Sequence, residues 1–367
     1  MITADYLIVG SGLTGATLAR LLTDEGREVV VLDRRSHLGG NVHDEVHSSG
    51  IRIQKYGPHF FRTNSPHLWS FIQRFSDFYP FEARVLTQVD GRLETWPVTE
   101  KYLHRTVGPS WTPEFQGAPN NFEEASLALM PRAIYDKFVH GYTSKQWGVD
   151  PRSLDAKLAG RFDVRSDNDT RLSRHRYQGL PKGGFAGLMS QLLRGIPVHL
   201  EVDYLKCREE FRARKRLIFT GPIDEYYDYE FGRLAYRGQL RQTQYLPDVD
   251  RYQDNCVVNF PSVNDGPHIR RMEWKQMHPP HEHASLRGTV LTTETPTTPT
   301  HPNDFEYPFP DGKNADLYQT YLNRSQADPD VMFCGRLGEY RYLDMDQAIA
   351  RAFTLARRQL QLNVDEA

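Results

Sequence analysis

Cysteine is scarce in this sequence, neither sign of charge dominates, and no long hydrophobic run is present. Cys207, Cys256 and Cys334 are odd in number and far apart, which argues against a disulfide framework and a zinc-binding set. Free thiols are typical of a reducing compartment, so we expect a cytoplasmic protein. With 45 basic and 47 acidic residues the net charge is −2, so we expect neither nucleic acid nor a membrane as a partner.

The fairly apolar stretch at residues 6–22 contains three glycines and Arg20. We therefore interpret it as a buried strand followed by a helix rather than as a membrane anchor. The chain length of 367 residues exceeds what one small core accommodates and predicts two or three packed units.

The N-terminus has the pattern of a nucleotide-binding βαβ unit. Residues 5–9 form an apolar run typical of a buried parallel strand, a glycine-rich turn and a helical pattern follow, and residues 28–32 form the next strand. Asp33 closes that strand, where a carboxylate can bind ribose hydroxyls. The turn residues that we expect to hold a pyrophosphate at the helix N-terminus are Gly10, Gly12, Leu13, Thr14 and Gly15.

The segments that follow favour FAD over NAD as the cofactor. A basic residue and a glycine pair after the second strand can follow the adenosine and diphosphate of an extended FAD. Many FAD proteins return to the flavin with a late strand and a last helix, which we predict over 331–336 and 344–355. No second GxGxxG follows a strand, so we expect an external reductant such as NAD(P)H. The additional cofactor contacts expected are Arg34, Gly40, Asn41, Gly335, Arg336, Asp344 and Met345.

The pattern along the chain predicts a mixed α/β (α+β) fold with three parts. Residues 65–141 are mostly helical in pattern, with Pro131 expected to kink or split a helix, whereas residues 177–309 contain short β-like runs and proline-rich connections. We expect a Rossmann-like FAD-binding domain from residues 1–64, 195–235 and 328–367, an inserted helical domain from residues 65–160, and a mobile loop plus antiparallel-sheet substrate domain from residues 161–194 and 236–327.

Four further segments combine aromatic residues, arginine and glycine in a way that core packing does not require. They are residues 55–64 (KYGPHFFRTN), 141–148 (GYTSKQWG), 177–184 (YQGLPKGG) and 335–345 (GRLGEYRYLDM). Together with the βαβ unit they resemble the bacterial UDP-galactopyranose mutases, and the resemblance runs nearly from end to end. The second and fourth segments are quite specific, whereas a whole superfamily shares the FAD turn.

The resemblance implies an isomerase that interconverts the pyranose and furanose forms of a nucleotide-diphosphate hexose, by default UDP-galactopyranose and UDP-galactofuranose. It implies that reduced FAD attacks the anomeric carbon through N5 without net redox, and that two arginines neutralise the leaving diphosphate. By position in the family's motifs it implies catalytic roles for Arg161, Arg270 and His59, and substrate contacts from Tyr142, Trp147, Arg161, Arg270, Tyr307, Tyr342 and Asp344. On the residues alone, surface ion pairs, core packing or helix capping would account for the same side chains.

Two segments depart from the family pattern. Arg62 stands where the family has a second histidine, and this permanent cation would favour an anionic reduced flavin or reach a substrate hydroxyl. Leu172 and Ser173 stand where the family has a tyrosine and a phenylalanine, and residues 161–176 contain five arginines and three aspartates. Arg171 and Leu172 are therefore added to the expected substrate contacts. The segment is either a solvated charged loop or a rebuilt nucleotide pocket whose carboxylates bind guanine.

Several alternatives stay open on the sequence. The same chemistry on a GDP-hexose is the first, and an FAD amine oxidase-like enzyme is a second that would not need two arginines for a diphosphate. A nucleotide-sugar binder without catalysis is the third. The region between Trp96 and Tyr142 is shorter than in the bacterial family, where it takes part in dimer contacts, so a homodimer is expected with less support. No residue set predicts a metal site.

Overall fold

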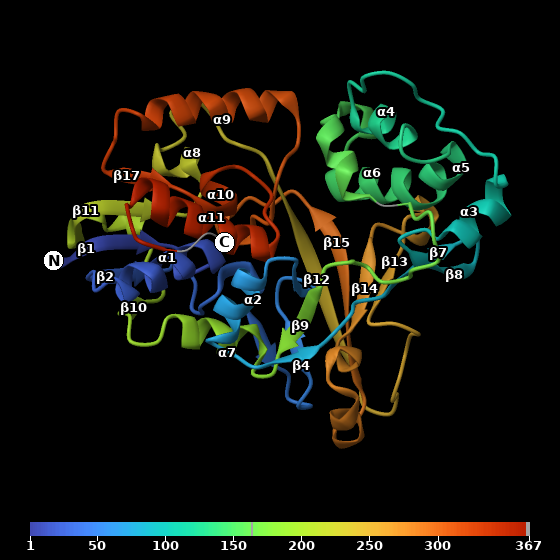
Figure 1. Cartoon of the computed structure of the whole chain (residues 1–367), viewed down its shortest axis with the longest axis horizontal. Coiled ribbons are helices and arrows are strands. Elements are labelled where there is room, and N and C mark those ends of the chain that lie inside the picture. The colour runs from blue at the N-terminus through green and yellow to red at the C-terminus, as the bar shows by residue number, and fades with distance from the viewer. Residues whose placement is uncertain (163, 365–367) are drawn as a thin grey trace.

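The structure is a computed structural model that describes residues 1–162 and 164–364. Figure 1 shows a layered unit of helices on a parallel sheet at one side, a long twisted sheet in the middle, and a separate group of helices beyond it. The N- and C-terminal segments both lie in the first unit, which the chain leaves and re-enters. The predicted mixed α/β fold is confirmed.

The parallel sheet has five strands in the order β10-β2-β1-β11-β17, and all its neighbours run parallel. Parallel strands of this kind are buried on both faces, and β2 is correspondingly a run of valines and leucine without a polar side chain. The strands are β1 (Ile2–Val9), β2 (Val29–Leu32), β10 (Val198–His199), β11 (Phe211–Phe219) and β17 (Val331–Phe333).

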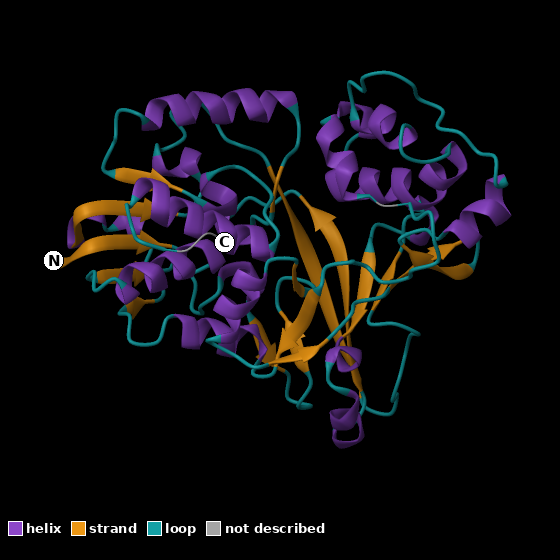
Figure 2. Ribbon diagram, in the orientation of Figure 1, coloured by secondary structure: helices purple, strands orange, loops and turns teal. Residues whose placement is uncertain are grey.

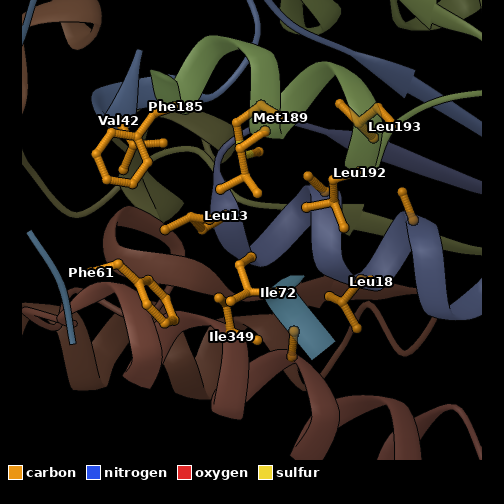
Figure 3. Packing of buried hydrophobic residues seen from close by; sticks show 14 of the residues in the cluster. Leu13, Leu18, Val42, Phe61, Ile72, Phe185, Met189, Leu192, Leu193 and Ile349 are labelled. Atoms are coloured by element: carbon orange, nitrogen blue, oxygen red, sulfur yellow. The ribbon is translucent and has the colours of Figure 1, made fainter. Parts of the chain in front are cut away.

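Three helices pack together against one face of this sheet. Helix α1 (Leu13–Asp24) lies between α11 (Met345–Gln359) and α7 (Gly184–Leu192). Figure 3 shows Leu18 of α1 and Ile349 of α11 on one side of this core and Met189 of α7 on the other. Burying each such side chain stabilises the fold by about 1.5–3 kcal/mol.

Helix α7 lies in the range that we expected to belong to the substrate domain. Its apolar face instead completes the core around α1, because Leu188, Met189 and Leu192 are buried there. The boundary of the FAD-side unit therefore falls before this helix rather than at residue 195.

The central sheet has seven strands in the order β16-β12-β15-β14-β13-β7-β8. All neighbours are antiparallel except β13 and β7, which run parallel. Figure 2 shows this sheet as the long orange layer between the two groups of helices. Its strands are β7 (Val85–Val89), β8 (Arg92–Trp96), β12 (Tyr236–Leu246), β13 (Val257–Asn259), β14 (Arg270–Glu273), β15 (Thr289–Thr297) and β16 (Tyr307–Pro308).

Strands β7 and β8 correct the expectation that residues 65–160 form a helical domain. They form a hairpin around Asp90 and Gly91, a dipeptide typical of two-residue hairpin turns. Val85, Thr87 and Val89 are buried and alternate with less buried neighbours, which is the period of a strand. Helices of this range are confined to its first few residues and to the part after Trp96.

The second group of helices has its own apolar core, around Phe122, Tyr135 and Phe138. Pro131 separates two helical segments, as predicted, and forms the N-cap of the second. That segment passes through a π-helical turn (Tyr135–His140), a rare form that is frequent at functional sites. The helices are α3 (Glu100–Val107), α4 (Phe122–Leu127), α5 (Arg132–Ile134), α6 (Gly141–Trp147) and a 3₁₀ segment (Ala156–Arg161).

Small sheets and short helices complete the fold. Strands β5, β9 and β6 form a three-stranded sheet, and β3 pairs with β4. Within residues 1–162 and 164–364, none of the helices combines the length and apolar character needed to cross a membrane. The elements are β3 (Asp44–Val46), β4 (Arg52–Gln54), β5 (Phe61–Thr63), α2 (Pro66–Gln73), β6 (Phe78–Pro80), β9 (Tyr177–Pro181), α8 (Ile223–Tyr226), α9 (Gly312–Ser325) and α10 (Gly335–Gly338).

Candidate active site

The turn between β1 and α1 forms a cradle of glycines. A Cβ on Gly10 would lie 2.0 Å from Thr220 Oγ1, and one on Gly15 would lie 2.1 Å from the Gly10 carbonyl oxygen, so both positions require glycine. Gly12 has no atom within 4 Å of its Cβ position. Since α1 has no side-chain cap, its first backbone N–H groups are left for a phosphate.

Asp33 at the end of β2 is fixed beside this cradle. Its Oδ2 accepts hydrogen bonds from the Ser11 backbone nitrogen (2.8 Å) and hydroxyl (2.6 Å), and its Oδ1 accepts one from the Arg35 nitrogen (2.9 Å). Each carboxylate oxygen has two lone pairs, so Oδ1 retains one for a ribose hydroxyl.

A cavity of about 190 Å³ runs from the glycine cradle to His59 and Met345. All the expected cofactor residues line it except Asp344. Thr220, Phe305 and Leu343 also line it and were not predicted. The residues present fit an extended dinucleotide, with the phosphates at the cradle and a ring system at the His59 end. The expected residues in its wall are Gly10, Gly12, Leu13, Thr14, Gly15, Asp33, Arg34, Gly40, Asn41, Gly335, Arg336 and Met345.

His59 is held as a neutral imidazole at the far end of this cavity. Its Nδ1 lies 2.8 Å from the Gly57 carbonyl oxygen, so Nδ1 carries the proton and donates it. Its backbone nitrogen donates to Gln54 Oε1 (2.5 Å). Burial, helped by the nearby Arg336 guanidinium, lowers the His59 pKa to about 4.

Arg270 lies beside this end of the cavity in a buried network of four charged residues. Its Nε donates to Glu294 Oε2, and Arg241 Nε donates to Glu294 Oε1 (2.8 Å). Arg241 also donates from its two terminal nitrogens to Glu306 (2.7 and 2.9 Å). In the described part of the chain, the terminal nitrogens of Arg270 have no hydrogen-bond partner and are available to a ligand.

Arg161 reaches the same region from the end of its 3₁₀ segment. Its guanidinium carbon lies 3.9 Å from the centre of the Tyr342 ring, a cation–π distance. The Arg336 guanidinium lies 4.6 Å from the same ring centre. Tyr307 stacks on Tyr342 with ring centres 6.0 Å apart. Residues that are distant in sequence therefore meet as an aromatic platform covered by arginines.

Tyr142 and Trp147 reach the platform from α6. Trp147 is buried and lies edge-on to Tyr307 (6.5 Å) and Phe309 (5.6 Å). Burial raises the Tyr142 pKa, and the adjacent Arg270 and Arg161 guanidinium groups oppose that rise. The tyrosine is therefore a neutral phenol that lies near both predicted arginines.

Arg62 joins the site through Asp344. Its terminal nitrogen lies 3.3 Å from Asp344 Oδ2, and the Tyr342 hydroxyl donates to Asp344 Oδ1 (3.1 Å). Asp344 is also the N-cap of α11, in a capping box with Gln347. The capping that the sequence offered as an alternative to a site role is therefore observed, and the same carboxylate contacts Arg62 and Tyr342.

The structure does not bring Arg171 and Leu172 to this site. Arg171 pairs with Asp169 (2.8 Å) and Glu82 (3.1 Å), and Leu172 packs against the main hydrophobic core. Asp167 and Asp169 bind arginines of the same segment, so neither carboxylate is free to bind a guanine. Asp163 lies outside the described residues. These contacts favour the charged-loop interpretation of the segment.

The sequence interpretation missed Arg241, Glu294 and Glu306. The only local signal is a charged residue at an inward position of a strand, as in the run Thr-Thr-Glu-Thr-Pro around Glu294. Such a residue is costly to bury unless paired, and its partners lie on other strands. Among the described residues, no group of three or more histidine, cysteine or carboxylate side chains is arranged for a metal ion.

The glycine cradle at the parallel sheet, the cavity and the arginine cluster together define an enzyme with a Rossmann-like nucleotide-binding domain. The family described as NAD(P)-binding Rossmann-like domain matches residues 8–75, and the family described as UDP-galactopyranose mutase matches residues 137–342. The chain belongs to the UDP-galactopyranose mutase family, which confirms the resemblance and makes the protein an isomerase of the sugar-nucleotide pyranose mutase class.

Individual relatives agree with this assignment. The chain is 32% identical to the dTDP-fucopyranose mutase of Escherichia coli, covering 97% of this chain and 98% of the relative. It is 29% identical to the UDP-galactopyranose mutase of Mycoplasma pneumoniae over 97% of this chain and 96% of the relative. A crystal structure of reduced UDP-galactopyranose mutase superposes with a TM-score of 0.74 at 16% identity, covering 100% of this chain and 96% of that one.

Proposed function

We propose that this protein interconverts the pyranose and furanose forms of a nucleotide-diphosphate hexose with reduced FAD bound in the 190 Å³ cavity. The observation that carries the proposal is the meeting of a dinucleotide cavity with a cluster of arginines at the His59 end. Among the described residues, Arg161, Arg241, Arg270 and Arg336 meet two carboxylates there, Glu294 and Glu306. The neighbouring Arg62–Asp344 ion pair adds no net charge, so these groups together carry a net charge of two positive.

That charge suits a leaving diphosphate. When the bond between the sugar and the diphosphate breaks, negative charge accumulates on the phosphate oxygens, and preformed cations stabilise it. Arg270 offers two terminal nitrogens in the planar arrangement that binds phosphate oxygens in pairs. Arg161 sits on the Tyr342 ring at the end of a short 3₁₀ segment, from which a small movement would bring it onto the diphosphate.

The other residues bind and orient the substrate. Tyr142 and Trp147 on α6 supply aromatic surface for the nucleoside, and Tyr307 lies close to the Arg270 guanidinium. His59, neutral and hydrogen-bonded through Nδ1, adds no charge beside the flavin. Reduced FAD would supply the nucleophile at N5, and an external reductant such as NAD(P)H would keep it reduced.

UDP-galactopyranose is the substrate that we propose first. dTDP-fucopyranose is a second candidate, because the relative that acts on it is 32% identical along nearly the whole chain. The GDP-hexose alternative depended on free carboxylates in residues 161–176, and Asp167 and Asp169 are both paired with arginines. An amine oxidase-like reaction involves no diphosphate, so its substrate would not need the arginine cluster.

Anaerobic turnover of the dithionite-reduced protein tests the proposal. UDP-galactose, dTDP-fucose and GDP-hexoses are supplied separately, and furanose product is measured by chromatography. We expect furanose from at least one of the first two and none from the oxidised protein. Normal flavin reduction without furanose from any of them would contradict the proposal, and peroxide formation from an amine substrate would favour the oxidase.

A further inference from the structure

The buried ion network behind Arg270 contains one arginine that the proposed reaction does not use directly. Arg241 contacts Glu294 and Glu306 with all three of its guanidinium nitrogens. Its side chain is 14% exposed, Glu294 is fully buried and Glu306 is 5% exposed. A cation held this way cannot reach far toward a ligand, so its effect is exerted through its partners.

The sheet fixes the geometry of the network. Arg241 on β12 lies directly opposite Glu294 on β15, and Glu294 lies directly opposite Arg270 on β14. Cross-strand neighbours of this kind have Cβ atoms about 5 Å apart, so the three side chains form a row across three strands. The position of Gly57 beside this row also matters, because a Cβ there would lie 2.6 Å from Glu294 Oε1.

The charges of the row decide what Arg270 presents to a ligand. Two arginines and two carboxylates balance, so Glu294 is shared and Arg270 keeps its unpaired terminal nitrogens. Without Arg241, the same space would hold one arginine and two buried carboxylates. Glu294 would then bind Arg270 alone, and the uncompensated negative charge would repel a phosphate.

We propose that Arg241 is a positioning residue that leaves the terminal nitrogens of Arg270 unpaired and oriented toward the diphosphate of the substrate. Arg241 balances Glu294 and Glu306 from behind, while Arg270 makes the contact with the phosphate oxygens. This inference rests on the proposed function, because it takes the ligand of Arg270 to be a nucleotide diphosphate.

Measuring how a nucleoside diphosphate and its nucleoside bind to the Arg241→Met variant distinguishes the positioning role from a role in packing alone. UDP, dTDP and GDP are titrated calorimetrically into the wild-type holoenzyme, and the one that binds most tightly is compared with its own nucleoside. We expect the diphosphate to bind R241M about tenfold more weakly, with nucleoside binding unchanged. Arg241→Lys retains the charge and should recover most of the lost affinity.

Glu306→Gln supplies a second variant with the opposite expected sign. Removing this carboxylate makes the network more positive, so the diphosphate should bind E306Q more tightly than the wild type. A network that acted only by packing would weaken binding in both variants. Flavin content and circular dichroism establish that each variant is folded.

The outcomes distinguish failure of the positioning role from failure of the proposed function. Unchanged diphosphate affinity in R241M, or equal weakening of diphosphate and nucleoside, would overturn the positioning role alone. Weaker diphosphate binding in E306Q would overturn it as well. Absence of diphosphate binding in the wild-type holoenzyme would overturn both this inference and the proposed function.

Discussion

At the scale of single residues, the site combines permanent cations with rings that stay neutral. Arg270 and Arg161 keep their charge at every physiological pH, whereas burial lowers the His59 pKa to about 4 and raises the Tyr142 pKa. The charge of the site near neutral pH is therefore fixed by arginine and glutamate. Burial also raises the Glu306 pKa, and the two hydrogen bonds from Arg241 oppose that rise.

Replacing the proposed diphosphate ligands should abolish most activity. Arg270→Met and Arg161→Met each remove a cation beside the developing charge, which should cost roughly 3 kcal/mol of transition-state stabilisation, about a hundredfold in kcat/KM. Arg171→Met is the matched control, because Arg171 pairs with Asp169 and Glu82 at the surface and does not reach the site. Anaerobic kinetics of the reduced proteins measure all three. Full turnover in R270M would contradict the assignment.

Asp224 on α8 should make stability depend on pH. Burial raises its pKa to about 6, although its Oδ2 accepts a hydrogen bond from the Leu234 nitrogen (2.9 Å). The folded state therefore holds this proton more tightly than the unfolded state. Stability should fall by about 3 kcal/mol as pH rises from about 4 to about 6, and then stay level.

Asp224→Asn tests this dependence because an amide retains the acceptor oxygen without the charge. The free energy of unfolding in urea should be higher for D224N than for the wild type at pH 7.5, and the advantage should disappear near pH 4. An equal difference at both pH values would show that the Asp224 ionisation is not the cause.

At the scale of elements, the glycine turn before α1 contains one glycine that close packing requires and another that lies beside open space. Gly15 packs against the Gly10 carbonyl, whereas Gly12 borders open space. Gly15→Val should therefore disrupt the turn and lower the melting temperature, while Gly12→Ala should fold normally but hold FAD less tightly. Thermal unfolding and flavin content of purified protein distinguish the two. Full flavin content in G15V would contradict the close packing.

The accuracy of the sequence predictions also differed between elements. The βαβ unit and the last helix were predicted nearly at their observed bounds, because both have a strong local period and clear ends. The β7–β8 hairpin was missed although Asp90-Gly91 signals a turn, because its alternating pattern lies among helical segments. Helix α7 was placed in the wrong unit, since an apolar face does not specify the surface that it covers.

At the scale of the whole molecule, the dinucleotide cavity is shared by distant parts of the chain. Its wall includes residues near 10–15, 33–42, 220–222, 302–305 and 335–348. Bound FAD would therefore contact several segments at once, and these contacts would be lost on unfolding. At a free FAD concentration a hundred times Kd, it should add about 2.7 kcal/mol to the free energy of unfolding.

Removing and restoring the cofactor tests this linkage. The apoprotein should melt at a lower temperature than the holoenzyme, and titrated FAD should restore the difference with a logarithmic dependence on concentration. Riboflavin, which lacks the pyrophosphate and adenosine, is the control and should restore little of it. Identical melting of apoprotein and holoenzyme would contradict the shared-cavity arrangement.

The sequence by itself determined the βαβ unit with its glycine turn and the family, and it predicted the arginines and aromatic residues that the structure brings together at one end of the cavity. These depend on local patterns: a glycine turn between a strand and a helix, and short segments such as GYTSKQWG. The tertiary structure alone decided that Arg241, Glu294 and Glu306 stand behind Arg270 and that Arg171 does not reach it. Contacts across three strands depend on register and on which charges are paired, and neither is encoded in the spacing of residues along one segment.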